Sequence, residues 1–322
     1  MTVEPQPSAK RAFLPTPDPD RYFPASAVED ARRRIVRAVS RSEGPAVICG
    51  VAGLGKSQLL SVLDEQFRQE MSIIPVAAPQ VCSRRELLKT ILFRLNQSYR
   101  GLEDIEMRLS ILEHLTANEG VPGRLLLLID DADMLTLEVF DELRGLLGLV
   151  HAGSHLVHIV MTGAAALEER LAEPALDALS QRISVRCYLS PLTRDETYQY
   201  VRSQIAAIDS DPETILSSAA LEAIFSATDG VPRLINQLCD QLMCRASDGN
   251  ALPLDGGAVQ CAWSEIQQLP SPADIARPAV KAPAFDQKID EAEDAGVIEF
   301  GLLDDEDEPV ASVAVDDDQP AA

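Results

Sequence analysis

Short, wholly apolar stretches alternate with longer stretches in which apolar residues recur at helical spacing. The apolar stretches suit strands that are buried on both faces of a parallel sheet. After residue 190 the pattern is helical only. We therefore predict an α/β domain over residues 26–189, with a parallel sheet flanked by helices, and a small all-α domain over 190–269. The predicted strands are 46–49, 72–78, 125–129, 155–163 and 183–189, and the predicted helices of the second domain are 194–208, 218–228, 231–247 and 256–268.

The two ends of the chain differ in composition from the rest. Residues 1–25 are polar and rich in proline, which predicts a partly disordered N-terminal arm. Residues 271–322 hold 15 acidic and 3 basic side chains, whereas the other 270 residues hold 36 and 25. We predict a disordered acidic tail over 270–322. Its apolar island VIEFGLL, residues 297–303, is either a segment that binds an unknown protein partner or a residual apolar stretch in a solvating tail.

Charge and cysteine usage narrow the class of protein. The net charge of −23 argues against broad nucleic-acid binding, which needs a basic surface, but it does not exclude a local basic patch.

The six cysteines form no C-x-x-C pair, so we interpret them as reduced, buried thiols. No apolar run approaches the roughly 18 residues of a membrane helix, and the N-terminus lacks a signal-peptide pattern. We expect a cytoplasmic protein with no transmembrane span.

The stretch GVAGLGKS carries the clearest chemistry. It matches G-x-x-x-x-G-K-[ST] and lies between a predicted strand and a predicted helix, which makes a chance glycine-rich turn a poor explanation. Its glycines let backbone N–H groups turn toward phosphate oxygens, Lys56 would reach the β- and γ-phosphates, and the Ser57 hydroxyl would hold Mg²⁺. The predicted nucleotide-binding residues are Gly50, Val51, Ala52, Gly53, Leu54, Gly55, Lys56, Ser57 and Gln58.

Polar residues end two of the predicted strands. Asp130 and Asp131 follow LLLLI directly, at the carboxyl end of a central strand, where ligands bind in open α/β sheets. Asp130 fits the carboxylate that holds Mg²⁺ through water, and Asp131 fits the group that orients or deprotonates the attacking water. Thr162 ends the next strand and is a candidate sensor of the γ-phosphate.

Two further features have two interpretations each. In one interpretation, Tyr22 or Phe23 in the Pro-rich arm contacts the nucleotide base. In the other, the arm only packs on the core.

Ser26 is predicted to cap a helix over 27–40. The arginines of this helix form either a solvated face or a contact with DNA or another subunit, and they are Arg32, Arg33, Arg34, Arg37 and Arg41.

These motifs, in this order, resemble an AAA+ ATPase, and within that superfamily the general secretion pathway protein A (ExeA/GspA) type. The similarity runs from about residue 13 to 246. Its most specific parts are the run from QRI through SPLTRDETYQYV and the segment GVPRLINQLCD. The resemblance implies a P-loop AAA+ core with a helical lid, ATP hydrolysis with Mg²⁺, and a homo-oligomer with shared active sites. It also implies that Arg182 is the finger that reaches a neighbour's γ-phosphate and that Arg233 is the sensor arginine of the lid.

The chain departs from that family at three points. Asp131 stands where the family usually has glutamate, a change that affects the rate of hydrolysis more than nucleotide binding. The sequence GAAAL at 163–167 replaces G-Q-P-E-L, so the usual sensor amide is lost. The acidic tail stands where the secretion proteins continue into a membrane span and a peptidoglycan-binding domain, so their role in the cell envelope does not transfer.

Three functions fit these features. The leading hypothesis is an oligomeric ATP-hydrolysing motor or switch that remodels or recruits a protein partner. A nucleotide-gated scaffold with little hydrolysis fits Asp131 and the lost sensor amide. A DNA-linked regulator of the TniB/TnsC type fits the shared core and the basic helix.

Overall fold

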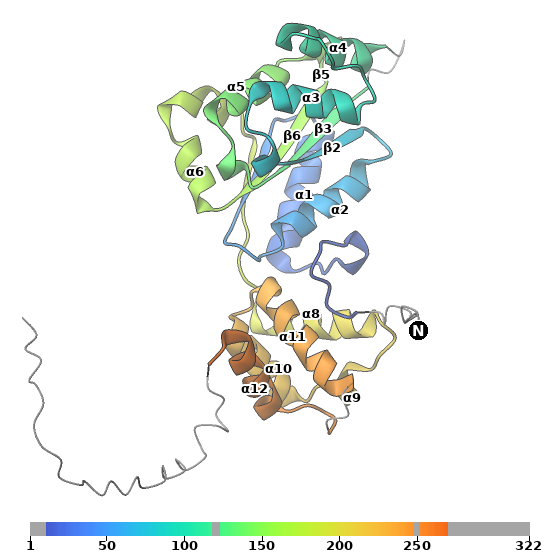
Figure 1. Ribbon diagram of the computed structural model, residues 1–322, viewed down its shortest axis with the longest axis vertical. Helices are drawn as coiled ribbons and strands as arrows, with labels where there is room; N and C mark the ends of the chain where they lie inside the picture. The colour runs from blue at the N-terminus through green and yellow to red at the C-terminus, as the bar shows by residue number, and fades with distance from the viewer. Residues whose placement is uncertain (1–10, 118–122, 248–250, 270–322) are drawn as a thin grey trace, which may run out of the picture. The chain divides into compact units, whose positions relative to one another are not determined.

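The computed structural model describes residues 11–117, 123–247 and 251–269. The predicted acidic tail and its apolar island at 297–303 lie outside the described residues. Within them, an α/β core is followed by a helical lid, as the sequence pattern predicted (Figure 1).

Five parallel strands form the sheet of the core, in the order β2-β3-β6-β1-β7. All five were predicted, and their carboxyl ends meet at one edge of the sheet. The edge strand β2 accommodates Pro75, which lacks an N–H to donate to a second neighbour. The strand bounds are β1 Ala46–Cys49, β2 Ser72–Ala77, β3 Leu125–Asp130, β6 Val157–Gly163 and β7 Val185–Tyr188.

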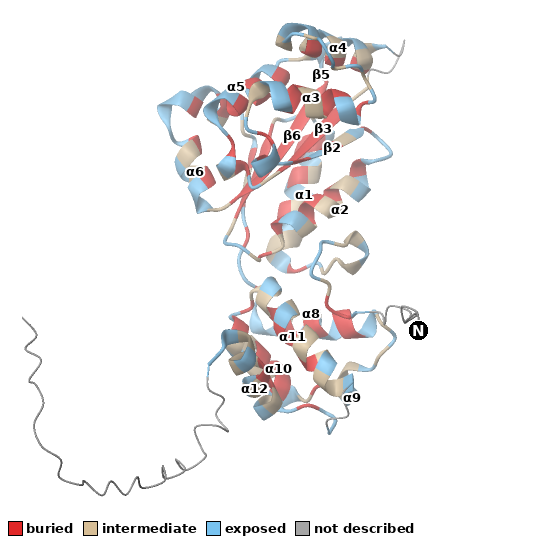
Figure 2. Ribbon diagram, viewed as in Figure 1, coloured by how far each residue is buried: buried red, intermediate tan, exposed pale blue. Residues whose placement is uncertain are grey.

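Helices cover both faces of the sheet because alternate strand residues point to opposite sides. Ala46 and Ile48 pack with α1 and α2 on one face, whereas Val47 and Cys49 pack with α3 to α7 on the other. Strands β1, β3 and β6 are buried along nearly all of their length, whereas buried and more exposed residues alternate in the edge strands β2 and β7 (Figure 2). The helix bounds are α1 Ser26–Ser40, α2 Lys56–Phe67, α3 Arg84–Arg94, α4 Asp104–Thr116, α5 Leu137–Leu146, α6 Ala165–Leu171 and α7 Asp177–Ser180, with short 3₁₀ helices η1 Pro19–Arg21, η2 Ala78–Gln80, η3 Ala132–Met134 and η4 Pro174–Leu176.

The lid has its own apolar core. The sequence Thr193-Arg-Asp-Glu196 at its start predicts a capping box, and the box is present, since Thr193 and Glu196 each accept a hydrogen bond from the other's backbone N–H. Phe13 of the N-terminal arm is 2% exposed and belongs to this lid core. The lid helices are α8 Arg194–Ala206, α9 Pro212–Ile215, α10 Ser218–Thr228, α11 Pro232–Ser247 and α12 Gly256–Gln267.

Several local predictions were wrong. The sequence pattern predicts one helix over residues 137–150, but α5 ends at Leu146, and a small hairpin follows, β4 Val150–His151 with β5 Ser154–His155. The short α9 was not predicted. Ser26 does not cap α1, because its N–H and its hydroxyl both donate to Glu196 Oε1 of α8, at 2.7 and 2.6 Å.

The cysteines are only partly as predicted. All six are free, but burial holds for Cys49, Cys187 and Cys239, while Cys82 and Cys244 are exposed. Helix α11 is amphipathic, and Cys244 lies on its outer side, a distinction that the apolar sequence neighbourhood did not reveal. Among the described residues, no helix is both long and apolar enough to cross a membrane.

A buried histidine in β6 predicts a pH-dependent stability. His158 is 4% exposed, and its Nε2 accepts a hydrogen bond from Arg124 Nε at 3.2 Å. Burial and the nearby Arg124 charge lower the pKa of His158 from 6.5 to about 4. As pH falls, His158 is therefore protonated in the unfolded chain before it is protonated in the folded chain. The neutral, buried His158 stabilises the fold above pH 6.5, and this stabilisation is lost as pH falls toward 4.

We expect the free energy of unfolding to be lower at pH 4.5 than at pH 7 by roughly 2 kcal/mol. The paired carboxylates contribute less in this window, because Glu29 and Glu196 have pKa values lowered from 4.5 to about 2 and lose most of their stabilisation below about pH 4.5. Denaturant unfolding at both pH values measures the difference, and His158→Gln should remove most of it. An equal loss in wild type and variant would contradict this assignment.

Candidate nucleotide site

The loop Gly50–Ser57 joins β1 to α2 at the carboxyl edge of the sheet. Gly53 and Gly55 have φ values of +90° and +88°, which L side chains rarely adopt. A Cβ at Gly53 would lie 2.8 Å from the Cβ of Arg233 in the lid, so only glycine lets the lid approach this closely. The Arg233 N–H also donates to the Gly53 carbonyl at 3.1 Å.

Lys56 is held against this loop. Its side chain is 8% exposed, and Nζ donates to the carbonyls of Gly50 and Val51 at 2.8 and 3.0 Å. Because α2 begins at Lys56, the first backbone N–H groups of this helix also have no intrahelical acceptor. The ammonium group and the helix N-terminus together make this loop suited to an anion such as a phosphate.

Two hydroxyls meet one carboxylate beside the loop. Ser57 Oγ donates to Asp130 Oδ2 at 2.5 Å, and Thr162 Oγ1 donates to Asp130 Oδ1. Thr162, at the end of β6, is fully buried. The structure therefore brings together Ser57 of the phosphate loop and two residues that the sequence placed at separate strand ends, and it places Thr162 in contact with the predicted metal-site acid.

Asp131 directly follows this cluster and has an unusual backbone. Its φ and ψ are 54° and 43°, in the left-handed region. Partial burial, followed by the charges of Asp130 and Asp133, raises the pKa of Asp131 above its ordinary value. The residue is exposed and lines the cleft described next, which is where a group acting on attacking water has to lie.

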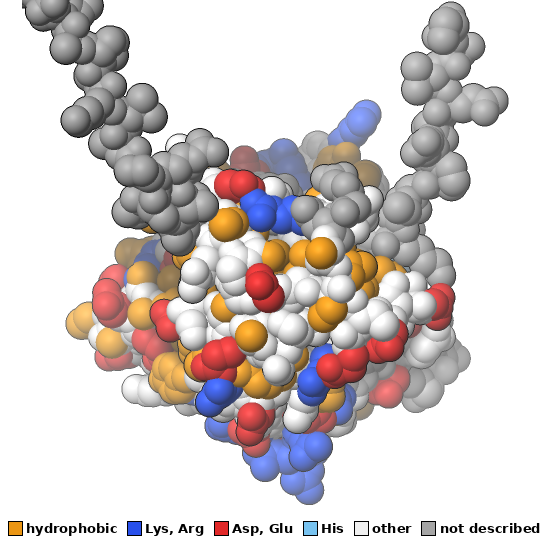
Figure 3. All heavy atoms as spheres, turned by 90° about the horizontal axis from the view of Figure 1, so that it is seen from below, with side chains coloured by type: hydrophobic (Ala, Val, Ile, Leu, Met, Phe, Trp, Pro, Cys, Tyr) orange, Lys and Arg blue, Asp and Glu red, His pale blue; other side chains and the backbone are white. Residues whose placement is uncertain are grey.

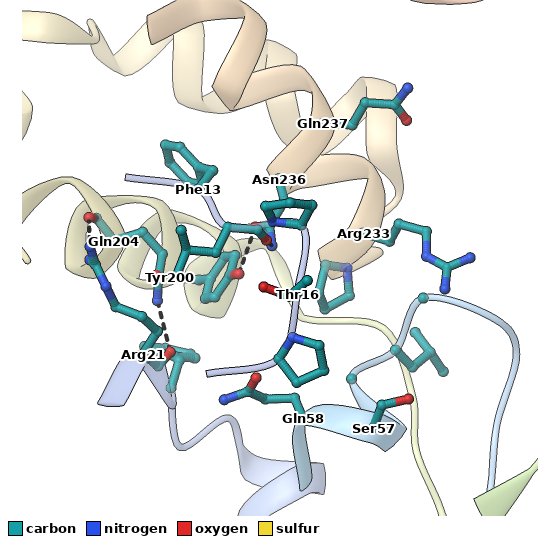
Figure 4. Close-up of a pocket in the computed structure, with 18 of the residues that line it drawn as sticks. Phe13, Thr16, Arg21, Ser57, Gln58, Tyr200, Gln204, Arg233, Asn236 and Gln237 are labelled. Carbon is teal, nitrogen blue, oxygen red and sulfur yellow. Dashed lines mark hydrogen bonds between the residues drawn. The ribbon is translucent and has the colours of Figure 1, made fainter. Parts of the chain in front are cut away.

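A cleft of about 890 Å³ extends from the loop between core, arm and lid. Arg233 at the start of α11 and Ser57 at the start of α2 face each other across its loop end (Figure 4). The other end of the cleft is lined by the arm and by α8 and α11 of the lid. The lid residues that line it there include Tyr200 and Gln204 of α8 and Asn236 of α11.

The arm is fastened to both sides of this cleft. Gln58 of α2 exchanges two hydrogen bonds with the backbone of Asp18, at 2.8 and 2.5 Å. On the lid side, Gln204 Nε2 donates to the Arg21 carbonyl at 3.1 Å, and Asn236 Nδ2 donates to the Leu14 carbonyl at 3.3 Å (Figure 4). The sequence analysis missed these lid residues, because the partners lie far apart in the chain and form no local motif.

Two aromatic residues of the arm, Tyr22 and Phe23, contact other side chains of the protein. Tyr22 lines the cleft, but its hydroxyl donates to Glu29 Oε2 at 2.9 Å, and burial followed by this contact raises the pKa of Tyr22. Phe23 packs edge to face on Tyr200, with ring centroids 5.6 Å apart. The structure thus shows an arm that packs on core and lid, and contact of Tyr22 with a base stays a prediction.

Arg182 lies outside the cleft. It is exposed and precedes β7 near Pro45, whose carbonyl accepts the Ser184 N–H at 2.9 Å. Since β1 begins directly after Pro45, this is the amino end of the strands, opposite the phosphate loop. No residue of the described chain makes a hydrogen bond or ion pair with the Arg182 side chain, and the structure does not bring it to the nucleotide site of its own chain.

The arginines of α1 do not form a free basic surface. All five pair with carboxylates, with Arg32 and Arg33 on Glu29, Arg34 on Asp30, and Arg37 and Arg41 on Glu43. On the face seen in Figure 3, Lys and Arg side chains are also scattered among acidic ones. This pairing favours the solvated-face interpretation over a DNA contact.

The residues present fit a magnesium nucleotide. Ser57 and Asp130 offer the hard oxygen ligands that Mg²⁺ takes when most of its other positions are water or phosphate oxygens. No group of three or more His, Cys, Asp or Glu side chains that would hold a metal by itself occurs within the described ranges. Ser57 and Asp130 would therefore hold Mg²⁺ only together with oxygens that a bound nucleotide or water supplies.

Known proteins share this organisation. Residues 39–171 match the family model of the AAA domain. General secretion pathway protein A from Aeromonas hydrophila is 26% identical over 255 residues, which are 79% of this chain and 46% of that protein. ATP-dependent target DNA activator B of Escherichia phage Mu is 32% identical over 160 residues, 47% of this chain and 48% of that protein. The chain therefore spans about half the length of these curated relatives.

Solved structures with the same fold include two archaeal proteins. Cdc6p from Pyrobaculum aerophilum has a TM-score of 0.60 at 18% identity, over 77% of this chain and 71% of that one. The ORC1 protein of Aeropyrum pernix, solved in complex with DNA, has a TM-score of 0.61 at 15% identity, over 80% and 70%. At this identity they show the fold of core and lid.

Releasing the arm from α2 should loosen one wall of the cleft. Gln58→Ala removes two hydrogen bonds to Asp18 and should lower the free energy of unfolding by roughly 1–2 kcal/mol. Amide hydrogen exchange should rise in residues 14–18. Gln66→Ala is the matched control, because Gln66 lies on the same helix and accepts only an exposed bond from Arg32. Equal exchange changes in both variants would contradict the anchoring role.

Proposed function

We propose that the protein is an oligomeric ATPase whose active site is shared between subunits, on the ground that residues 39–171 match the family model of the AAA domain. The observation that carries the proposal is the cluster of Ser57, Asp130 and Thr162 beside the phosphate loop. The oligomer acts as a motor or switch on a protein partner. The scattered, internally paired arginines support a protein rather than a nucleic acid as that partner.

Each residue has a role that its position supports. Lys56 and the first N–H groups of α2 would bind the β- and γ-phosphates, and Ser57 with Asp130 would hold Mg²⁺, which would supply positive charge beside the transferred phosphoryl group. Asp131 accepts the proton of, or orients, the attacking water, and its raised pKa suits a base. Arg233 lies at the start of α11 and lines the cleft together with Ser57, so it would face bound phosphates from the lid.

Arg182 supports the shared site. It is exposed, without a described partner, and at the opposite end of the sheet from its own phosphate loop. A guanidinium in that position serves a neighbouring subunit, where it stabilises the charge that develops on the γ-phosphate. Thr162 replaces the lost sensor amide by linking β6 to Asp130.

Mixing variants tests the shared site. Arg182→Ala should bind ATP like wild type and lose turnover by roughly a thousandfold, and Lys56→Ala should lose ATP binding. A mixture of the two should recover turnover, because Lys56→Ala subunits supply Arg182 to ATP that is bound by Arg182→Ala subunits. Arg37→Ala, a surface arginine paired with Glu43, is the matched control and should change neither quantity.

The mixing experiment also separates the alternatives. Recovery in the mixture together with specific activity that rises with protein concentration supports the shared site. Full activity of Arg182→Ala, or no recovery in the mixture at any concentration, contradicts it. If wild type binds ATP but turns it over no faster than Asp131→Asn, the nucleotide-gated scaffold replaces the motor.

The similarity to a protein named ATP-dependent target DNA activator B favours a second candidate, ATP-dependent DNA binding. This candidate predicts retention on duplex DNA at low salt with ATP, and a steep loss of retention as salt rises. The leading proposal predicts no retention at about 50 mM salt. Retention that is abolished by Lys56→Ala would move the second candidate to the front.

A further inference from the structure

The loop that carries Asp131 is held by a side chain from another helix. Arg170 of α6 is half-buried, and its Nη1 donates to the carbonyl oxygens of Asp133, at 2.7 Å, and Leu135. Its guanidinium also lies 5.2 Å from the centre of the Phe140 ring in α5. A single charged group thus satisfies two backbone acceptors of the segment that directly follows Asp131.

A second contact fixes the same segment from the end of β6. Asp133 Oδ1 accepts the Ala164 N–H at 3.0 Å. A Cβ at Gly163 would lie 2.7 Å from that oxygen, so the glycine is what admits Asp133 at this distance. The loop is therefore tied to α6 by its carbonyls and to β6 by its carboxylate, and 3₁₀ bonds from Met134 N to Asp131 O and from Leu135 N to Ala132 O close it internally.

We propose that Arg170 is a positioning residue for Asp131, because it helps to hold the left-handed backbone at that residue. We also propose that this backbone conformation is the reason why aspartate, and not glutamate, acts on the attacking water here. The inference rests on the proposed hydrolytic function. Aspartate visits the left-handed region more readily than glutamate, because its short polar side chain makes local hydrogen bonds there. The turn directs a short carboxylate into the cleft, and a longer one at the same backbone would be misplaced.

The kinetic test separates positioning from binding. Arg170→Ala should lower kcat by about tenfold or more, because loss of the clamp misplaces the carboxylate, while KM and the Kd for ATP change by less than about twofold. Arg170→Lys should recover part of kcat through one remaining charged donor. Asp131→Glu should leave kcat at or below the wild-type value.

A double variant tests whether Arg170 acts through Asp131. In the Asp131→Asn background, whose amide keeps a preference for the left-handed region, Arg170→Ala should cause no further loss of kcat. Arg186→Ala is the matched control, since Arg186 binds Glu168 of the same helix α6 at 2.5 Å and makes no contact with the loop. An equal loss in both backgrounds, or an equal loss in Arg186→Ala, would overturn the proposal.

Amide hydrogen exchange supplies a readout that does not depend on hydrolysis. The amides of Met134 and Leu135 should exchange faster in Arg170→Ala than in wild type, and Arg186→Ala should leave them unchanged. Unchanged exchange in Arg170→Ala overturns the clamp even where the enzyme is active. If wild type shows no turnover above Asp131→Asn but the exchange rises as expected, the hydrolytic function fails and the clamp on the loop stands.

Discussion

The hydrogen bond from Ser57 to Asp130 is the contact on which the rest of the site depends. It joins the phosphate loop to the end of β3, although β6 lies between β1 and β3 in the sheet. The bond forms because all five strands run parallel and end at one edge, so that residues 73 positions apart in the chain meet. Thr162 fills the gap between them at the end of β6, and the carboxylate of Asp130 is satisfied from both sides.

A second constraint is the set of contacts by which the arm and the lid enclose the cleft beside the loop. Gly53 admits the start of α11 to within contact of the loop, and the arm bridges core and lid through Gln58 on one side and Gln204 and Asn236 on the other. The cleft is thus enclosed by three segments that are held to one another. The lid thus contacts the loop through Arg233, and the arm links it to α2.

Local signals explain what the sequence allowed us to predict. The strands were recognised because buried parallel strands are continuously apolar, and the loop because phosphate binding needs glycines and lysine at fixed spacing. The Ser57 and Asp130 partnership followed from the place of Ser57 in the phosphate loop and of Asp130 at a strand end. The sequence did not predict the hydrogen bonds between Gln58 and Asp18 or between Ser26 and Glu196. Glutamine or glutamate near the start of a helix can bond to many different nearby groups, so the residue type does not identify the partner. The left-handed turn at Asp131 likewise depends on Arg170, which lies 39 residues away and belongs to no motif.

Calorimetric titration of ATP, with and without Mg²⁺, tests the central claim that Ser57 and Asp130 form the protein half of a magnesium nucleotide site. In wild type we expect Mg²⁺ to tighten ATP binding by about tenfold or more, since the Ser57 hydroxyl and the Asp130 carboxylate would both help to hold the ion. Asp130→Asn should bind ATP without Mg²⁺ as wild type does and should lose most of the gain. Tightening by Mg²⁺ that is equal in wild type and Asp130→Asn, or absent in wild type, would contradict the account.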